Sequence, residues 1–458
     1  MSDPITMHQQ KKKYLVVGLG ITGLSCVRFL KKHGHEVTVM DSRAHPPGEA
    51  ELKQYGADVV LHTGIFSDAL IEQAEEIILS PGIPLSNPCF QRALARGQSI
   101  VGDIELFCRH AKAPIIAITG ANAKSTVTDL MATVIAQSGL RVAMGGNIGV
   151  PALDLLDQPW PDYYALELSS FQLETTYSLS ARVACILNIT PDHMDRYDSL
   201  QAYQYAKQRI YQGCEIAVFN RDDLLTKPLN AVTSVSFTAG RPAVGEWGLR
   251  QQAGEWYFAH GEICVMPVKT LALIGKHNQL NALAVLAMAS ALHIPLSVLE
   301  KTFATYPGLP HRCQKIGEYA EVAWYDDSKG TNVGATQAAI EGLGSSIQGR
   351  IILIAGGVGK DADFSLLADP IHRYVRKTIL IGQDGPIIAA CLAEKQFVYA
   401  ATLTEAVQQA YRLAQPGDAV LLSPACASFD MFKSFVHRGE MFQQAFLQLQ
   451  EADDEKKT

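Results

Sequence analysis

Residues 117–126, AITGANAKST, combine residue types that bind a nucleotide phosphate. An apolar strand enters a turn, and Lys124 and Ser125 open a helix. A phosphate-binding loop needs backbone N–H groups around the phosphate, a lysine cation and a hydroxyl for Mg²⁺. The usual pattern, G-x-x-x-x-G-K-[ST], has glycine where this chain has Ile118 and Ala123. We predict nucleotide binding, provided that Ala123 avoids positive φ, keeps a backbone conformation that alanine tolerates and aims its N–H at phosphate.

A glycine-rich loop near the N-terminus, the first glycine loop of the chain, is a further candidate for phosphate binding. Gly18, Gly20 and Gly23 form G-x-G-x-x-G between a predicted strand and helix, and Asp41 ends the next strand. Such glycines let a diphosphate approach a helix N-terminus, and the acid could bind a ribose hydroxyl. The alternative is a tight turn without a ligand, and a sugar diphosphate would fit as well as a dinucleotide. Two such loops favour an ATP-driven reaction on a nucleotide-linked substrate.

Alternating strands and helices must position these loops. Short apolar runs alternate with helical periodicity, which indicates an α/β fold with largely parallel sheets. A helix is expected at 124–137, and residues 230–270, including the run SVSF, are expected to form a small antiparallel patch. YPGLPHR (306–312) has the composition of an interdomain linker, and the charged tail EADDEKKT is expected to fray.

Length and composition narrow the class of protein. The chain has 458 residues, 48% hydrophobic and 19% charged, with a net charge of −7. This length predicts several domains, and scattered Lys and Arg argue against a nucleic-acid surface. No apolar run is long enough for a membrane span, and nine cysteines without a C-x-x-C pair are typical of reduced thiols. We expect a cytoplasmic protein.

A series of motifs along almost the whole chain resembles the Mur ligases. The motifs occur in that family's order: TGANAKST (119–126), GGNIG (145–149), ELSSFQLE (167–174), NITPDHMDRY (188–197), YAKQRIY (205–211), GKHNQLNA (275–282), LPHR (309–312), DDSKGTN (326–332) and SPACASFD (423–430). The family's loop usually reads G-T-N-G-K-[ST], so Ile118 is shared with it. Ala121, Ala123 and Val358, which replaces an acid in G-G-D-G-K, are departures of this chain.

The resemblance implies three domains and a ligase reaction. It implies a Rossmann-like UDP-substrate domain (1–103), a P-loop ATPase-like central domain (104–307) and a Rossmann-like amino-acid domain (308–458). The pattern is similar to members that add D-glutamate to UDP-N-acetylmuramoyl-L-alanine in peptidoglycan synthesis. ATP would convert the substrate carboxylate into an acyl phosphate, and the amine of D-glutamate would attack it. We expect a monomer that needs ATP and two Mg²⁺ ions.

The resemblance also assigns site residues. The catalytic and metal-binding positions are Lys124, Ser125, Glu167, His193 and Lys207. At the position of Lys207 the family carries a carbamylated lysine. Positions near ATP are Gly120, Asn122, Ala123, Lys124, Ser125, Thr126, Asn278, Arg312 and Asp327. Positions near the UDP-substrate are Gly18, Gly20, Ile21, Thr22, Asp41, Ser42, Arg43 and Asn147. Positions near D-glutamate are Lys329, Thr331, Lys360, Ser428 and Phe435.

Four other functions are compatible with part of these motifs. A sister Mur ligase with another amino acid shares the ATPase core, but the D-N-P-R motif of the diamino-acid-adding members is absent. A folylpolyglutamate synthase-like ligase is the alternative outside cell-wall synthesis. An NAD-dependent oxidoreductase would use only the first glycine loop. A non-enzymatic ATP-gated module would close on ATP without releasing phosphate.

Overall fold

The computed structural model describes residues 11–273, 275–359 and 362–457 and forms three α/β domains, each built on its own sheet. The chain divides into two compact units, and each is described separately. The first unit comprises the chain up to Phe237 together with Ala284–Val298. The second comprises Thr238–Leu283 and the chain from Leu299 onward.

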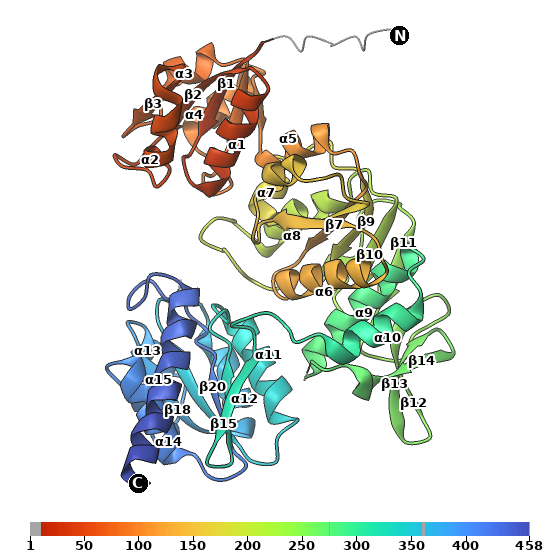
Figure 1. The fold of residues 1–458 in the computed structure, drawn as a ribbon, viewed down its shortest axis with the longest axis vertical. Coiled ribbons are helices and arrows are strands. Elements are labelled where there is room, and N and C mark those ends of the chain that lie inside the picture. Colours follow the sequence, from red (N-terminus) through yellow and green to blue (C-terminus); the bar gives the residue numbers. More distant parts are fainter. Residues whose placement is uncertain (1–10, 274, 360–361, 458) are drawn as a thin grey trace. The chain divides into compact units, whose positions relative to one another are not determined.

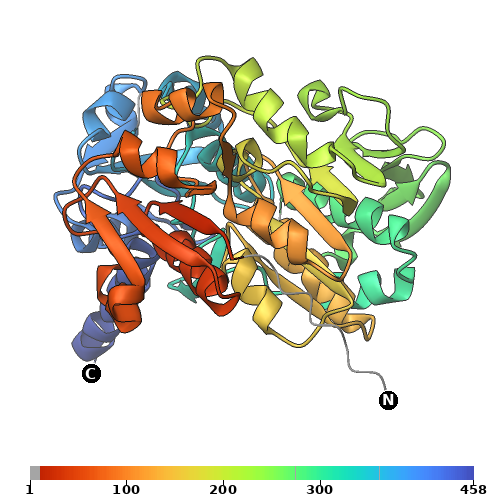
Figure 2. The same ribbon diagram turned by 90° about the horizontal axis from the view of Figure 1, so that it is seen from above.

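The N-terminal sheet has five parallel strands in the order β3-β2-β1-β4-β5. Figure 2 shows its strands side by side in red and orange. Leu15, Val16 and Val17 of β1 are all buried, as expected for a parallel strand covered on both faces. The elements are β1 (Lys13–Val17), α1 (Ile21–Lys32), β2 (Glu36–Asp41), α2 (Glu49–Leu52), β3 (Val59–Thr63), α3 (Asp68–Gln73), β4 (Glu76–Leu79), α4 (Pro88–Ala95) and β5 (Ser99–Val101).

The central domain contributes six parallel strands to the first unit, in the order β11-β10-β9-β6-β8-β7. β6 lies between β8 and β9, so the carboxyl ends of these three strands meet at one edge of the sheet. The elements are α5 (Asp103–His110), β6 (Ile115–Thr119), α6 (Lys124–Gln137), β7 (Val142–Gly146), β8 (Tyr163–Glu167), α7 (Ser170–Glu174), β9 (Ala181–Ile186), α8 (Leu200–Gln208), β10 (Ile216–Asn220) and β11 (Ser234–Phe237).

The second unit contains an antiparallel meander and the C-terminal sheet, whose order is β15-β16-β20-β17-β18-β19. Figure 1 shows α14 and α15 side by side. The meander is β12 (Trp247–Gln252), β13 (Glu255–His260) and β14 (Ile263–Pro267), and the helices α9 (Lys276–Ala291) and α10 (Leu296–Thr305) follow it in the chain. The remaining elements are β15 (Gln314–Tyr319), β16 (Val322–Asp326), α11 (Val333–Gly344), β17 (Ile351–Gly356), α12 (Ala368–Tyr374), β18 (Val375–Ile381), α13 (Gly385–Ala389), β19 (Phe397–Tyr399), α14 (Leu403–Leu413), β20 (Ala419–Leu422) and α15 (Phe435–Lys457).

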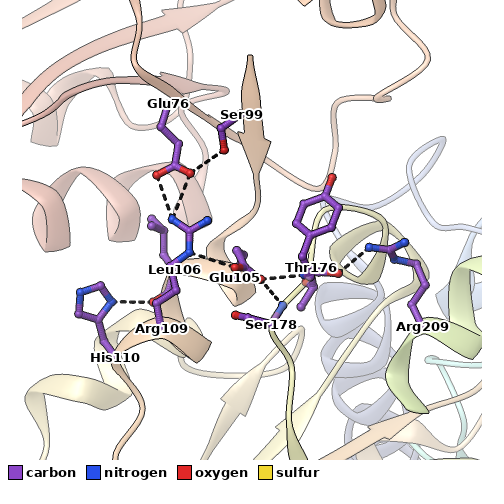
Figure 3. Close-up of polar contacts among 10 residues, drawn as sticks. Glu76, Ser99, Glu105, Leu106, Arg109, His110, Thr176, Ser178 and Arg209 are labelled. Atoms are coloured by element: carbon purple, nitrogen blue, oxygen red, sulfur yellow. Dashed lines mark hydrogen bonds and ion pairs between the residues drawn. The ribbon is translucent and has the colours of Figure 1, made fainter. Parts of the chain in front are cut away.

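Within the first unit, a polar network joins the N-terminal sheet to the central domain (Figure 3). Arg109 of α5 donates from Nη1 to both carboxylate oxygens of Glu76, at 3.1 and 2.9 Å. Its Nε donates to Glu105, which also accepts the backbone N–H groups of Tyr177 and Ser178. Both carboxylates are almost fully buried, so these charge-assisted hydrogen bonds offset the cost of removing them from water.

Two details of the predicted fold are wrong. SVSF was expected in the antiparallel patch, but it forms β11, which pairs in parallel with β10. The tail EADDEKKT was expected to fray, but α15 continues to Lys457. No helix among the described residues has the length and apolar character to cross a membrane.

Candidate active site

The predicted phosphate loop lies at the carboxyl end of β6 and leads into α6, which spans 124–137 as expected. Lys124 Nζ donates to the carbonyl oxygens of Gly120 and Ala121, at 2.9 and 3.0 Å. Ser125 and Thr126 lie in the first turn of α6 and are largely buried. The loop thus already places the lysine cation and the hydroxyl next to its own backbone.

Asn188, which follows β9, holds this loop in place. Its Oδ1 accepts the N–H of Asn122 at 2.8 Å, its Nδ2 donates to the Asn122 carbonyl, and its backbone carbonyl accepts the N–H of Ala121. Such a two-way amide contact needs an Asn side chain, which has both a donor and an acceptor. Sequence reasoning did not single out Asn188, although it opens the motif NITPDHMDRY.

The backbone of Ala123 contradicts our expectation. It has φ 65° and ψ −1°, in the left-handed region, immediately before α6. The sequence argument required negative φ because a β-carbon disfavours this region. The loop nevertheless takes the left-handed turn that glycine usually supplies, since the strand and the helix on either side fix its ends. Alanine therefore strains the loop without changing its path.

We expect Ala123→Gly to raise the free energy of unfolding by about 0.5–1 kcal/mol. Relief of the left-handed strain exceeds the extra chain entropy that glycine brings to the unfolded state. Thermal denaturation should show a melting temperature about 2 °C higher. Ala136→Gly, at an exposed position inside the same helix, is the control and should melt lower. A lower melting temperature for Ala123→Gly would contradict the strain argument.

Glu167 ends β8, beside the phosphate loop. Its side chain is 2% exposed, and Oε2 has no hydrogen-bond partner among the described residues. Its other oxygen, Oε1, accepts a hydrogen bond from Asn147 Nδ2 at 2.7 Å. Asn147, predicted near the UDP-substrate, therefore lies directly against the predicted metal carboxylate. A buried carboxylate oxygen without a protein donor suits a cation ligand.

Lys207 of α8 is 1% exposed and also reaches the phosphate loop. Its Nζ donates to the Gly120 carbonyl at 2.8 Å and to Thr119 Oγ1 at 3.3 Å. Burial, reinforced by the positive charge of Lys124, lowers the pKa of this amine well below its usual range, although Asp192 and Glu167 oppose the shift. This shift increases the fraction of neutral amine, which is the form that carbamylation requires.

His193 lies in the loop after β9, with φ 57°. Its ring contacts Phe171 edge-on at 4.8 Å between centroids, and its Nε2 lies 3.7 Å from Asp192 Oδ2. Among the described residues, no group of three or more His, Cys, Asp or Glu side chains could hold a metal ion. A cation here would need ligands beyond Glu167 and His193, such as the Ser125 hydroxyl or ligand phosphates.

The first glycine loop closes as its pattern predicts. A β-carbon on Gly23 would lie 1.9 Å from the Gly18 carbonyl oxygen, so only glycine fits there. Asp41 is buried, which alone would raise its pKa, but hydrogen bonds from Arg43 and the Leu19 N–H lower the pKa to about 2. Gly20 immediately precedes α1. Ile21 (75% exposed), Thr22 and the exposed Ser42 complete the predicted set on this edge of the sheet.

The second unit gathers two motif loops around Asp327. Asp327 Oδ2 accepts the hydroxyl of Ser423 at 2.6 Å, and Oδ1 accepts the N–H of Cys313. Burial raises the Asp327 pKa to about 7. Arg438 is fully buried and donates to the carbonyls of Ser328 and Cys426, which ties DDSKGTN to SPACASFD. Sequence reasoning missed Arg438, because an arginine in a helix is usually a surface residue.

The other predicted residues of this unit fall into two groups. Lys329 Nζ lies 4.1 Å from the ring centroid of Phe435, the first residue of α15, while Thr331 and Ser428 belong to the two motif loops. Asn278 accepts a hydrogen bond from Asn281 near the start of α9. Arg312 is the last residue of the predicted linker, and its charge lowers the Asp327 pKa against the larger effect of burial. Lys360 lies outside the described residues.

Three family models match the chain. They are the Mur ligase MurD-like N-terminal domain at residues 12–102, the Mur ligase middle domain at 118–289, and the Mur ligase glutamate ligase domain at 311–426. These matches agree with the order of the three sheets.

Similar full-length proteins give the same result. The UDP-N-acetylmuramoylalanine–D-glutamate ligase of Nitrosococcus oceani is 51% identical and covers 94% of this chain and 95% of its own. The ligase of the same name from Legionella pneumophila strain Paris is 48% identical and covers 94% of this chain and 97% of its own.

Solved structures share the fold at low identity. MurC from Thermotoga maritima has a TM-score of 0.61 at 19% identity and covers 95% of this chain and 99% of its own. MurF from the same organism, in complex with ADP, has a TM-score of 0.62 at 15% identity, covering 96% and 97%. Because three Mur ligase family models match this chain and its relatives share about 50% sequence identity with it, the chain belongs to the Mur ligase family.

Proposed function

We propose that this protein joins D-glutamate to UDP-N-acetylmuramoyl-L-alanine in an ATP-dependent amide ligation of peptidoglycan synthesis. The observation that carries the proposal is the meeting of three groups at the carboxyl ends of β6, β8 and β9. These are the phosphate loop with Lys124, the buried carboxylate of Glu167, and the segment with Asn188 and His193. The names of the relatives at about 50% identity support the choice of substrates.

The reaction must first activate a carboxylate. A carboxylate oxygen attacks the γ-phosphorus of ATP, ADP leaves, and an acyl phosphate forms. The D-glutamate amine then attacks the carbonyl carbon to give a tetrahedral intermediate. This collapses to the amide and inorganic phosphate, and the amine loses a proton. Since two anions must approach each other in the first step, the cation of Lys124 lowers the barrier by balancing their charge.

We infer that two Mg²⁺ ions would bind at this edge. Ser125 Oγ and the unpartnered Oε2 of Glu167 would hold one ion, and His193 with a carbamylated Lys207 would hold the other. When bound, Mg²⁺ neutralises phosphate charge during phosphoryl transfer. Carbamylation would turn the Lys207 amine into an anionic oxygen ligand, consistent with its burial and its lowered pKa.

Residues of the second unit would supply the amino-acid site. Lys329, held over the Phe435 ring, would pair with a carboxylate of D-glutamate, with Thr331, Ser428 and Lys360 as further ligands. Asn278, Arg312 and Asp327 would contact ATP.

The N-terminal sheet would bind the UDP part of the substrate. Gly18, Gly20, Ile21, Thr22, Asp41, Ser42 and Arg43 lie at or beside the first glycine loop, and Asn147 would face the muramoyl part. We further propose that the protein acts as a cytoplasmic monomer, with domain boundaries at 103/104 and 307/308.

One assay separates this function from its alternatives. The protein is incubated with ATP, Mg²⁺, UDP-N-acetylmuramoyl-L-alanine and one amino acid at a time, and phosphate release is measured. We expect release with D-glutamate only. Release with L-lysine or diaminopimelate but not D-glutamate would identify a sister ligase. Release with a folate substrate and L-glutamate would identify the folylpolyglutamate-type alternative. No release with any acceptor, together with NAD binding, would favour an oxidoreductase.

A further inference from the structure

Residues 80–84, SPGIP, follow β4 and form one wall of the first glycine loop. In the order β3-β2-β1-β4-β5, the chain reverses its direction of winding between β1 and β4, which is where open α/β sheets bind ligands. Ser80 Oγ donates to the Gly18 carbonyl at 2.9 Å. A β-carbon on Gly18 would lie within 2.9 Å of Ser80 and Ile83, so the two loops are in close contact.

Arg196 holds this segment from the other side. Its guanidinium donates from Nη1 to the Pro81 carbonyl at 2.7 Å and from Nη2 to the Ile83 carbonyl at 3.4 Å. The side chain is only 12% exposed. Because the C=O and N–H of one peptide point in opposite directions, the N–H of Gly82 points away from Arg196. This N–H has no acceptor within the described chain, so a bound anion could accept it.

The same arginine is fixed to the residues around the predicted metal site. Its Nη2 pairs with Glu174 Oε2 at 3.0 Å, and its guanidinium lies 4.0 Å from the ring centroid of Phe171. Phe171 and Glu174 both lie in α7, four and seven residues beyond Glu167 in the chain, and the Phe171 ring contacts His193. The backbone N–H of Arg196 also donates to the His193 carbonyl at 2.9 Å.

We propose that Arg196 is a positioning residue that couples the UDP-substrate site to the loop carrying His193. By holding two carbonyls of segment 80–84, it orients the wall of the first glycine loop. Through Phe171 and its own backbone, it fixes the ring and the left-handed backbone of His193. Occupation of the substrate site and ordering of the catalytic loop then favour each other. The inference rests on the proposed function, because the proposed function identifies the UDP-substrate as the ligand of the first glycine loop.

The test compares Arg196→Met with Arg209→Met. Arg209 is the matched control because it also holds α7 and the residues just after it, donating to the carbonyls of Leu173 and Thr176 at 2.6 Å each, but among the described residues it makes no hydrogen bond to segment 80–84. Calorimetry with UDP-N-acetylmuramoyl-L-alanine should show about tenfold weaker binding for Arg196→Met, the effect of losing hydrogen bonds from a charged donor. ATP affinity should stay within about twofold. Arg196→Lys, which keeps the charge, should lie between the wild type and Arg196→Met.

The hydrogen-exchange rate of residues 190–198 is a second measurement, and a merely structural role of Arg196 would not change its response to substrate. Substrate binding should slow exchange there in the wild type and in Arg209→Met, but not in Arg196→Met. Equal substrate affinity in Arg196→Met and the wild type would overturn the inference, as would equal weakening in both methionine variants. If the wild type itself does not bind the UDP-substrate, the proposed function fails and the inference fails with it.

Discussion

Lys124→Met is expected to lower kcat by about 100- to 1,000-fold at saturating substrates. The substitution keeps most of the side-chain volume but removes the cation that balances charge as the carboxylate approaches the γ-phosphate. It has a second effect, because the charge of Lys124 helps to lower the pKa of Lys207. Without that charge the Lys207 pKa rises, and a smaller fraction of the amine is neutral and able to take up CO₂.

The measurement is steady-state phosphate release, with ATP binding measured separately by calorimetry. Lys112→Met is the control, since Lys112 is exposed and its ammonium group lies over the ring of Trp160. It should keep wild-type kcat. A Lys124→Met variant that melts normally and retains more than about a tenth of wild-type kcat would remove Lys124 from phosphoryl transfer.

Lys207→Ala is expected to reduce activity by at least about 100-fold, with partial recovery on addition of a small carboxylate such as acetate or propionate. The truncation leaves a space beside Thr119 and Gly120, where Nζ donates hydrogen bonds in the wild type. An added carboxylate could place an oxygen there, as the carbamate would. The wild-type protein, with no added carboxylate, should become more active when bicarbonate is added, because carbamylation consumes CO₂.

Lys207→Met is the matched control for this rescue. Methionine fills much of the same volume, so an added carboxylate has no room and should not restore activity. Rescue of both variants would indicate an effect of the acid elsewhere in the protein. Wild-type activity in Lys207→Ala would exclude Lys207 from the site altogether.

Periodicity predicted most elements of the fold, because buried parallel strands such as KYLVV and the helix 124–137 carry strong local patterns. Segments with weak local sequence patterns were predicted less accurately. β11 has only four residues, and its partner strand cannot be read from its own alternation. α15 continues through the charged tail, although the composition of this tail predicts that it frays.

The motifs indicated which side chains to expect together at the candidate site, and the chemical roles of these side chains stay predictions. Lys124, Glu167 and Lys207 lie at or next to adjoining strand ends, as the motifs implied. Residues that hold the loops of each unit in place were missed, since Asn188, Arg196 and Arg438 act through contacts with distant backbone carbonyls or N–H groups. Such contacts depend on tertiary packing and leave no pattern of spacing. Ala123 was mispredicted because the ends of its loop outweigh the local preference of alanine.

The transfer of one oxygen atom tests the central claim, activation of a carboxylate as an acyl phosphate. UDP-N-acetylmuramoyl-L-alanine labelled with ¹⁸O in its terminal carboxylate is incubated with the protein, Mg²⁺, ATP and D-glutamate, and the phosphate released is analysed by mass spectrometry. We predict that each phosphate molecule carries one oxygen from the carboxylate, since the bridging oxygen of the acyl phosphate leaves with phosphorus. Amide formation with unlabelled phosphate would contradict this account.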